Sequence, residues 1–180
     1  MTTILLARHG ETDWNAQRRV QGHSDTLLND NGRAQALALA ETLDGAVVDA
    51  VYSSDLARAS DTAQVVADRL GLPVRVLPEL RERDFGTWEG LTDKEILARF
   101  PAAKSGSWGD GETKEEMRER VLAGLRRIAA EHPGGRVLVV THGGPVRALL
   151  VESGLDGRGP IPNCSLYEVR FRDDRVVGID

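Results

Sequence analysis

The stretch Ile4-Leu5-Leu6-Ala7-Arg8-His9-Gly10-Glu11 joins an apolar run directly to a cation, an imidazole and a glycine. A short apolar run closed by such a turn predicts a buried strand over residues 3–7. A neutral imidazole has one nitrogen lone pair that can attack phosphorus, while its other nitrogen keeps a proton. The neighbouring Arg8 could hold phosphate oxygens in a planar fork. Taken alone, however, this pair is more often an ordinary loop edge.

A second histidine follows a second apolar run in the same way. Residues 137–141 are typical of a strand covered on both faces, and His142-Gly143-Gly144 comes directly after them. Pro145 suits the first turn of a following helix. Ligands in sheets of parallel strands bind beyond the carboxyl ends of the strands, so His9 and His142 could reach one crevice. Two histidines at strand ends favour a functional site.

Strands and helices alternate along the rest of the chain. Strands are predicted over residues 50–53 and 74–77, and the tail is predicted to form a hairpin over residues 165–179 with its turn at Asp173-Asp174. Helical spacing of apolar residues predicts helices that end near Leu43, Leu70, Arg99 and Glu131. The helix that ends near Leu70 would be capped by Ser54 or Asp55. This pattern predicts an α/β fold, a three-layer αβα sandwich with a mostly parallel central sheet and a C-terminal antiparallel hairpin.

Length and charge narrow the classes of protein. A chain of 180 residues predicts a single domain over residues 1–180. Residues 102–113 show little periodicity and several turn formers, which predicts a lid-like segment over about residues 91–113. The net charge of -5 argues against broad binding to nucleic acid or to an anionic membrane. The N-terminal apolar run is too short for a secretory or membrane segment, so we expect a cytoplasmic protein.

Five short blocks, in order over nearly the whole chain, contain the residues best suited to bind phosphate and to transfer protons. They are Leu6 to Thr12 with Asn15 and the loop Gln21-Gly22, Tyr52 to Leu56 with Arg58 and Thr62, Leu80-Arg81-Glu82 with Phe85 to Gly90, Gly111-Glu112-Thr113, and Thr141 to Gly144. Together they resemble the signature of the histidine phosphatase superfamily, also called phosphoglycerate mutase-like, in its short bacterial phosphatase branch.

The resemblance implies a role for each chemical group. His9 would be the nucleophile that becomes phosphohistidine, and Glu82 would protonate the leaving oxygen. An alkoxide leaves badly without a proton, and the deprotonated carboxylate could then activate water. Fixed cationic donors would stabilise the charge that spreads over the phosphoryl oxygens. The residues implied to surround the phosphate are Arg8, Asn15, Arg58, His142 and Gly143. Of these, His142 is also expected to be a catalytic residue.

Some candidates have ordinary explanations as well. Glu82 lies among charged residues, so a surface ion-pair loop is its alternative, and Arg58 could be a solvated helix residue. His23 follows the loop closely enough to line a pocket, but a surface position is equally compatible with the sequence. Trp108 lies in the expected lid and could contact substrate. The candidates for substrate binding are Gln21, Gly22, His23 and Trp108.

A zinc site formed by His9, His142 and Glu11 is conceivable but disfavoured. The sequence has no HExxH or His-x-His pair, and paired arginines would repel a cation. The resemblance also implies no metal and no other cofactor. The single cysteine, Cys164, cannot form an intramolecular disulfide and is expected to be a packing residue.

The sequence therefore predicts a phosphoric monoester hydrolase that acts on a small soluble phosphate ester. The first alternative is a cofactor-dependent phosphoglycerate mutase, an isomerase that would need extra basic residues after Glu82. This chain offers only Lys94, Arg99 and Lys104 in a compact segment. The second alternative, a non-catalytic phospho-ligand binding module, would not need the acid. The resemblance allows a homodimer and implies neither a nucleic acid nor a membrane partner.

Overall fold

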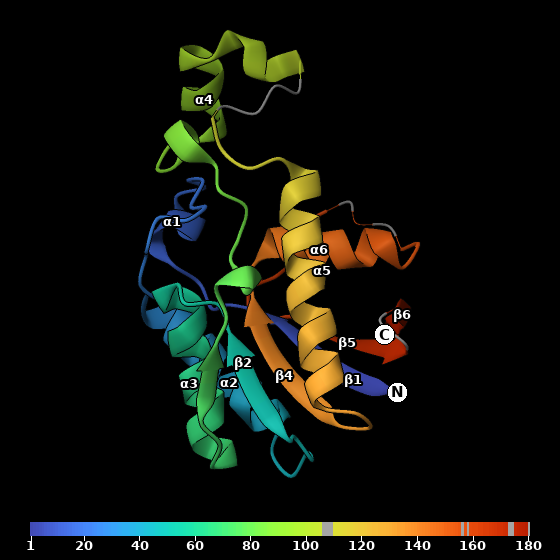
Figure 1. Ribbon diagram of the computed structural model, residues 1–180. Helices are drawn as coiled ribbons and strands as arrows, with labels where there is room; N and C mark the ends of the chain where they lie inside the picture. Colours follow the sequence, from blue (N-terminus) through green and yellow to red (C-terminus); the bar gives the residue numbers. More distant parts are fainter. Residues whose placement is uncertain (106–109, 156, 158, 173–174, 180) are drawn as a thin grey trace.

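A mixed sheet forms the centre of the computed structural model, which describes residues 1–105, 110–155, 157, 159–172 and 175–179. Four strands run parallel: β1 (Thr2–Arg8), β2 (Ala50–Ser53), β3 (Val74–Val76) and β4 (Arg136–Thr141). The last two strands are β5 (Leu166–Arg172), which is antiparallel to β1, and β6 (Arg175–Ile179), which is antiparallel to β5. The order across the six-stranded sheet is β3-β2-β4-β1-β5-β6 (Figure 1). The predicted antiparallel C-terminal pair is confirmed, while the turn predicted at Asp173-Asp174 lies outside the described residues.

Alternate residues of the buried strands supply two hydrophobic cores, one on each face of the sheet. On one face, Leu5 and Val140 pack with residues of α2 (Asp30–Thr42) and α3 (Ala57–Leu70). On the other face, Leu6 and Val139 pack with α5 (Lys114–Glu131) and α6 (Gly143–Glu152) (Figure 1). Each fully buried aliphatic side chain contributes about 1.5–3 kcal/mol. The two cores confirm the predicted αβα sandwich and explain why these strands are apolar throughout.

The start of α3 differs from the prediction. The helix begins at Ala57, and neither Ser54 nor Asp55 caps it. The Ala57 N–H instead donates to Asp25 Oδ1 at 2.7 Å, so the cap comes from a distant loop. Both predicted caps are engaged elsewhere, because Ser54 contacts His142 and Asp55 binds the guanidinium of Arg81.

The pairing of β1 with β4 brings the two histidines together. Arg8 pairs with Thr141 in the parallel register, and the His9 N–H donates to the Thr141 carbonyl at 2.9 Å. His9 and His142 therefore follow their strands at the same edge of the sheet. Three short elements lie beyond this edge (Figure 1): α1 (Asp13–Ala16), and the 3-10 helices η1 (Pro78–Leu80) and η2 (Gly86–Trp88).

The segment expected to act as a lid contains α4 (Asp93–Arg99) and the 3-10 helix η3 (Pro101–Ser105), which project beyond the carboxyl ends of the parallel strands (Figure 1). Thr92 and Glu95 form a capping box at the start of α4. Trp108 lies outside the described residues. Within the part of the chain that the structure describes, no helix is both long enough and apolar enough to span a bilayer.

Candidate active site

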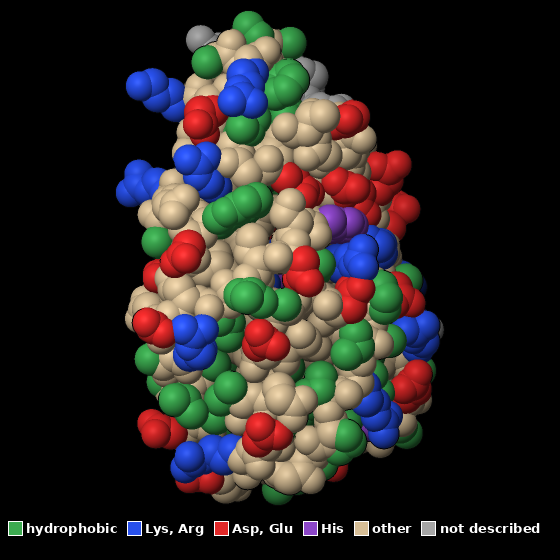
Figure 2. Space-filling model, turned by 90° about the vertical axis from the view of Figure 1, so that its left-hand side faces the viewer, with side chains coloured by type: hydrophobic (Ala, Val, Ile, Leu, Met, Phe, Trp, Pro, Cys, Tyr) green, Lys and Arg blue, Asp and Glu red, His purple; other side chains and the backbone are tan. Residues whose placement is uncertain are grey.

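A cavity of about 290 Å³ opens at the carboxyl ends of β1 and β4. Four arginines and one carboxylate are among its lining residues, so its walls carry a positive charge that the chain as a whole lacks. Basic and acidic side chains are interspersed over the molecular face drawn in Figure 2. An anion would therefore be bound by the arginines of this cavity, and not by a general positive charge of the surface. The residues predicted for the site that line this cavity are Arg8, His9, Asn15, Gln21, Gly22, Arg58, Glu82 and Gly143.

His9 is held as a neutral imidazole with a defined tautomer. Its Nδ1 lies 2.7 Å from the Gly10 carbonyl oxygen, which can only accept, so Nδ1 carries the proton and Nε2 keeps a lone pair. Burial lowers the pKa of His9 well below its ordinary value, and the charges of Arg58 and Arg8 lower it further. The ring is therefore uncharged at neutral pH, with Nε2 free of a proton, as a nucleophile requires.

His142 stands behind His9 and is not among the residues that line the cavity. It is fully buried, and its ring centroid lies 5.1 Å from that of His9. Its Nε2 lies 2.7 Å from Ser54 Oγ, and its Nδ1 has no hydrogen-bond partner among the described residues. Burial, followed by the charge of Arg58, lowers the pKa of His142 well below its ordinary value. His142 thus offers one unengaged nitrogen beside the nucleophile.

Arg58 is a buried helix residue and not a solvated one, since it is 1% exposed. Its Nη1 and Nη2 donate to the carbonyls of Ser24 and Gly22 at 2.8 and 2.7 Å. Burial lowers its pKa to about 10, so the guanidinium remains charged at neutral pH. Arg8 is fixed by a hydrogen bond from Nη1 to the Ile161 carbonyl. In the described part of the chain, Nε of both arginines has no hydrogen-bond partner, which leaves both cations with a donor for a bound anion.

Glu82 is fixed at the mouth of the cavity by backbone donors. Its Oε2 accepts from the Gly144 N–H at 2.9 Å, and its Oε1 accepts from the Arg83 N–H at 2.8 Å. A Cβ on Gly144 would lie 2.0 Å from Glu82 Oε1, so glycine at this position allows the carboxyl group to take its place. The surface ion-pair loop considered for Glu82 is not found. Its carboxyl group instead touches the first turn of α6 in the wall of the cavity.

The remaining candidates have different surroundings. Asn15 Oδ1 accepts from the Thr12 N–H at 3.1 Å, and Gln21 Oε1 accepts from Thr12 Oγ1 at 3.0 Å. His23 does not line the cavity; its Nε2 lies 2.9 Å from the Glu82 carbonyl oxygen. Among the described residues, no three His, Cys, Asp or Glu side chains are grouped so that they could hold a metal ion.

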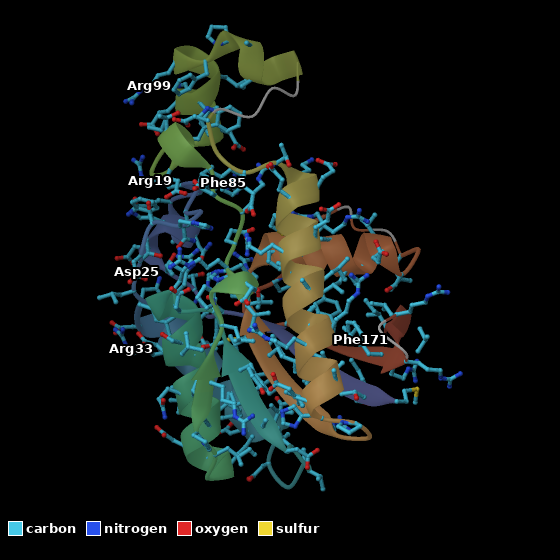
Figure 3. All side chains as sticks on the ribbon, in the orientation of Figure 1. Arg19, Asp25, Arg33, Phe85, Arg99 and Phe171 are labelled. Atoms are coloured by element: carbon cyan, nitrogen blue, oxygen red, sulfur yellow. The ribbon has the colours of Figure 1, made fainter. Side chains whose placement is uncertain are left out.

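Several lining residues were not anticipated from the sequence. Arg147 lies on α6, four residues after Gly143, and donates from Nε to the Gly157 carbonyl at 2.9 Å. That i,i+4 spacing on one helix face was the signal that could have revealed it. Arg19 and Phe85 also line the cavity, and Figure 3 shows both beyond the carboxyl edge of the sheet, below α4. Pro160 and Ile161 had no sequence signal, because they come from an irregular loop.

A second cavity of about 430 Å³ adjoins the first and shares Glu82 with it. Its other shared wall residues are Phe85, Gly144 and Arg147. Apolar atoms of Met117, Ala148 and Val151 contribute to the rest of the wall, together with charged side chains at the rim. A molecule bound with one end beside His9 could therefore extend past Glu82 into this space.

Cys164 behaves as the packing residue that the sequence predicts. It packs against the core between the sheet and α2 and α3. Its backbone N–H donates to the Arg8 carbonyl at 3.0 Å. Burial raises the pKa of its thiol to about 12, although the charge of Arg8 acts in the opposite direction. The thiol is therefore protonated at neutral pH and unsuited to be a nucleophile.

The combination of this fold with a cationic pocket centred on a neutral histidine defines a phosphate-handling enzyme. Residues 4–178 match the model of the Histidine phosphatase superfamily (branch 1), and the chain belongs to that family. The family expected from the sequence is confirmed.

Named relatives agree with this class. A metal-independent phosphoserine phosphatase of Arabidopsis thaliana is 40% identical, with 98% of this chain and 79% of the relative covered. A probable phosphoglycerate mutase GpmB of Enterobacter sp. (strain 638) is 34% identical, with 96% and 86% covered. The solved structure of a mycobacterial glucosyl-3-phosphoglycerate phosphatase in complex with VO3 superimposes with a TM-score of 0.86 at 32% identity, with 98% and 97% covered. The expected phosphoric monoester hydrolase accords with the two relatives named phosphatases.

Proposed function

We propose that the protein hydrolyses a small phosphate monoester through a phosphohistidine intermediate on His9. The observation that carries this proposal is the tautomer of His9, whose Nδ1–H is bound to the Gly10 carbonyl and whose Nε2 lone pair is free to attack. The unengaged Nε donors of Arg8 and Arg58 support a phosphoryl group beside that nitrogen. Fixed donors of this kind stabilise the charge that develops on the phosphoryl oxygens.

In the first step, the Nε2 lone pair of His9 forms a bond to phosphorus as the ester P–O bond breaks. The departing oxygen takes the proton of the Glu82 carboxyl group, so the alcohol leaves neutral and Glu82 becomes a carboxylate. General acid catalysis of this kind typically contributes about 10²–10⁴-fold. The position of Glu82 in the wall shared by both cavities supports this role.

In the second step, the Glu82 carboxylate accepts a proton from water while the water oxygen attacks phosphorus. The P–N bond breaks, its electron pair returns to Nε2 of His9, and inorganic phosphate is released. Glu82 ends protonated, ready for another turnover. No metal takes part in either step of this proposal.

The arrangement of the two cavities suggests how the ester lies. The acid must touch the leaving oxygen, so the alcohol part extends past Glu82 into the adjoining cavity. Arg147 lies in the wall common to both cavities and could bind a carboxylate on the alcohol. The relative named phosphoserine phosphatase supports a substrate of this size. Gln21 and Gly22 would line the phosphate side.

The mutase alternative has a specific difficulty. A relative named probable phosphoglycerate mutase keeps it under consideration. However, Lys94 and Arg99 are exposed and are not among the residues that line either cavity, and Arg99 points outward in Figure 3. Lys94 and Arg99 therefore do not reach either cavity, and the side chain of Lys104 lies outside the described part of the chain. The relatives named phosphatases support hydrolysis over isomerisation. The lid-like role of residues 91–113, a homodimer and a cytoplasmic location stay predictions.

The test combines product analysis with trapping of the intermediate. Phosphate release from a panel of esters, phosphoserine among them, is measured beside 3-phosphoglycerate isomerisation, and phosphorus-labelled ester is used to trap phosphoprotein. We expect release without isomerisation, and no trapping or turnover in His9→Ala. The control His132→Ala removes a histidine that contacts Tyr52 and should keep both signals. Isomerisation without release, or label retained on His9→Ala, would overturn the proposal.

A further inference from the structure

The Gly111-Glu112-Thr113 element has no place in the chemistry described above, yet Glu112 binds an arginine that reaches the catalytic loop. Arg120, on α5, donates from Nε and Nη2 to the two carboxylate oxygens of Glu112 at 2.8 and 2.7 Å. This is a bidentate pair with both side chains largely shielded from solvent.

The other donors of Arg120 bind main-chain carbonyls around the acid. Nη1 donates to the carbonyls of Glu79 and Arg81 at 2.8 and 3.1 Å, and Nη2 donates to the Glu82 carbonyl at 3.0 Å. A guanidinium has five N–H groups, and here all five have an acceptor. A lysine could not reproduce this pattern, because its three N–H donors all radiate from one nitrogen atom.

The loop that carries Glu82 is thereby held at consecutive positions. The carbonyls of residues 79, 81 and 82 accept from Arg120, and the carbonyl of Leu80 accepts from Thr141 Oγ1 at 2.7 Å. Thr141 precedes His142 at the end of β4. The loop is thus tied both to the sheet edge that bears the phosphate-binding groups and to α5.

The three residues of the element each help to hold Arg120 in place. A Cβ on Gly111 would lie 2.3 Å from the Asp84 carbonyl oxygen, so glycine allows the two segments to meet. The Glu112 N–H donates to that same oxygen at 2.9 Å. Thr113 caps α5 and forms a capping box with Glu116, which fixes the helix that carries Arg120.

We propose that Arg120 and Glu112 are positioning residues that set the location of the Glu82 carboxyl group against the leaving oxygen. The inference rests on the proposed acid role of Glu82. The pair touches neither cavity, since neither residue is among those that line them. Its effect passes through the backbone of the loop, while the phosphate is bound by groups on other elements.

This division has a measurable consequence. A displaced acid slows the step in which the leaving group needs a proton and leaves phosphate binding intact. Alkyl esters such as phosphoserine release a poor leaving group. An activated ester such as 4-nitrophenyl phosphate releases an oxyanion that departs without a proton. Loss of positioning should therefore affect the alkyl ester selectively, whereas general damage to the fold would affect both esters.

The experiment compares kcat/KM for both esters in Arg120→Met and in the wild type, because kcat/KM covers the steps up to phosphoryl transfer to His9 and excludes the hydrolysis step that both esters share. We expect kcat/KM with phosphoserine to fall about 10- to 100-fold, since a misplacement on the order of 1 Å can cost 10²-fold. With 4-nitrophenyl phosphate we expect a fall in kcat/KM of less than about threefold, because acid catalysis of the departure of the leaving group matters little there. Inhibition by inorganic phosphate should be unchanged. Glu82→Gln should show the same selectivity more strongly.

The matched control is Arg127→Met on the same helix. Arg127 binds the Glu79 side chain at 3.0 Å and donates to none of these carbonyls, so both esters should be turned over normally. If Arg120→Met does not fold, Glu112→Gln removes only part of the bidentate pair and should give a smaller loss with the same selectivity. An equal loss on both esters, or no loss, overturns the inference. A wild type that releases phosphate from neither ester would instead refute the proposed function.

Discussion

The two sides of the cavity differ in how they are built. The phosphate side consists of groups at strand ends and on one buried helix, and Arg58 and His142 are 1% and 0% exposed. The alcohol side is formed by residues of α5, of α6 and of the loop around Phe85, and Val151 on its wall is 60% exposed. The difference teaches that buried elements hold the nucleophile and the phosphate-binding groups, whereas more exposed segments line the space proposed for the alcohol.

The largest effect is expected where the two sides meet. In Gly144→Ala, the new Cβ would lie 2.0 Å from Glu82 Oε1 and would displace the carboxyl group. We expect kcat with phosphoserine to fall about 100-fold or more. Gly143→Ala should lose less activity, since the nearest atom, Arg8 Nε, is 3.6 Å from its added Cβ. Steady-state kinetics of both variants test this order, and equal losses would contradict it.

A smaller effect is expected on the alcohol side alone. Arg147→Met removes the cation proposed to bind a carboxylate on the alcohol, and a hydrogen bond to a charged group is worth about 1.5–3 kcal/mol. We expect KM for phosphoserine to rise about tenfold or more, while KM for 4-nitrophenyl phosphate and kcat change little. The control Arg136→Met removes a pair with Glu168 at the start of β4. If KM rose equally for both esters, Arg147 would act on the phosphate side instead.

The smallest effect concerns stability and belongs to the phosphate side. The pKa values of His9 and His142 are lowered on folding, so below about pH 6.5 the unfolded chain binds protons that the folded chain does not. The free energy of unfolding should therefore fall with decreasing pH, with a slope of up to about 1.4 kcal/mol per pH unit for each histidine, until the folded pKa is reached.

Urea unfolding between pH 7.5 and 5.5 measures this slope. His9→Asn and His142→Asn should each reduce it, because a neutral amide gains no proton in the unfolded chain. Arg147→Met, on the alcohol side, should retain it. A slope that persists unchanged in the two histidine variants would show that other groups cause the dependence.

The phosphate side could be predicted from the sequence because its signals are local. Apolar runs that lead straight into His9 and His142 locate both groups at the edge of a parallel sheet, and the resemblance added Arg58 and Glu82. The burial of Arg58 was not readable, since it depends on carbonyls of the loop around Gly22 that meet it only in the fold. The wrong cap of α3 has a similar origin, because Asp25 is distant in sequence.

The outer walls of the two cavities were largely missed. Pro160 and Ile161 have no periodicity, and their place in the wall depends on tertiary contacts such as the bond from Arg8 to the Ile161 carbonyl. Arg120 was also missed, since on a helix it reads as a solvated residue until its five acceptors are seen. Such residues act through backbone groups of other segments, and no sequence pattern encodes those partners.

The pairing of Arg8 with Thr141 gives the nucleophile the same resistance to local opening as the central strands themselves. A region that can open only when the whole sheet separates shares the global free energy of unfolding, while peripheral loops open at lower cost. The backbone that presents His9 and His142 therefore keeps its place in any molecule whose central sheet is intact. Substitutions in the outer loops can then change which substrate is preferred, while each successive variant keeps its nucleophile in place.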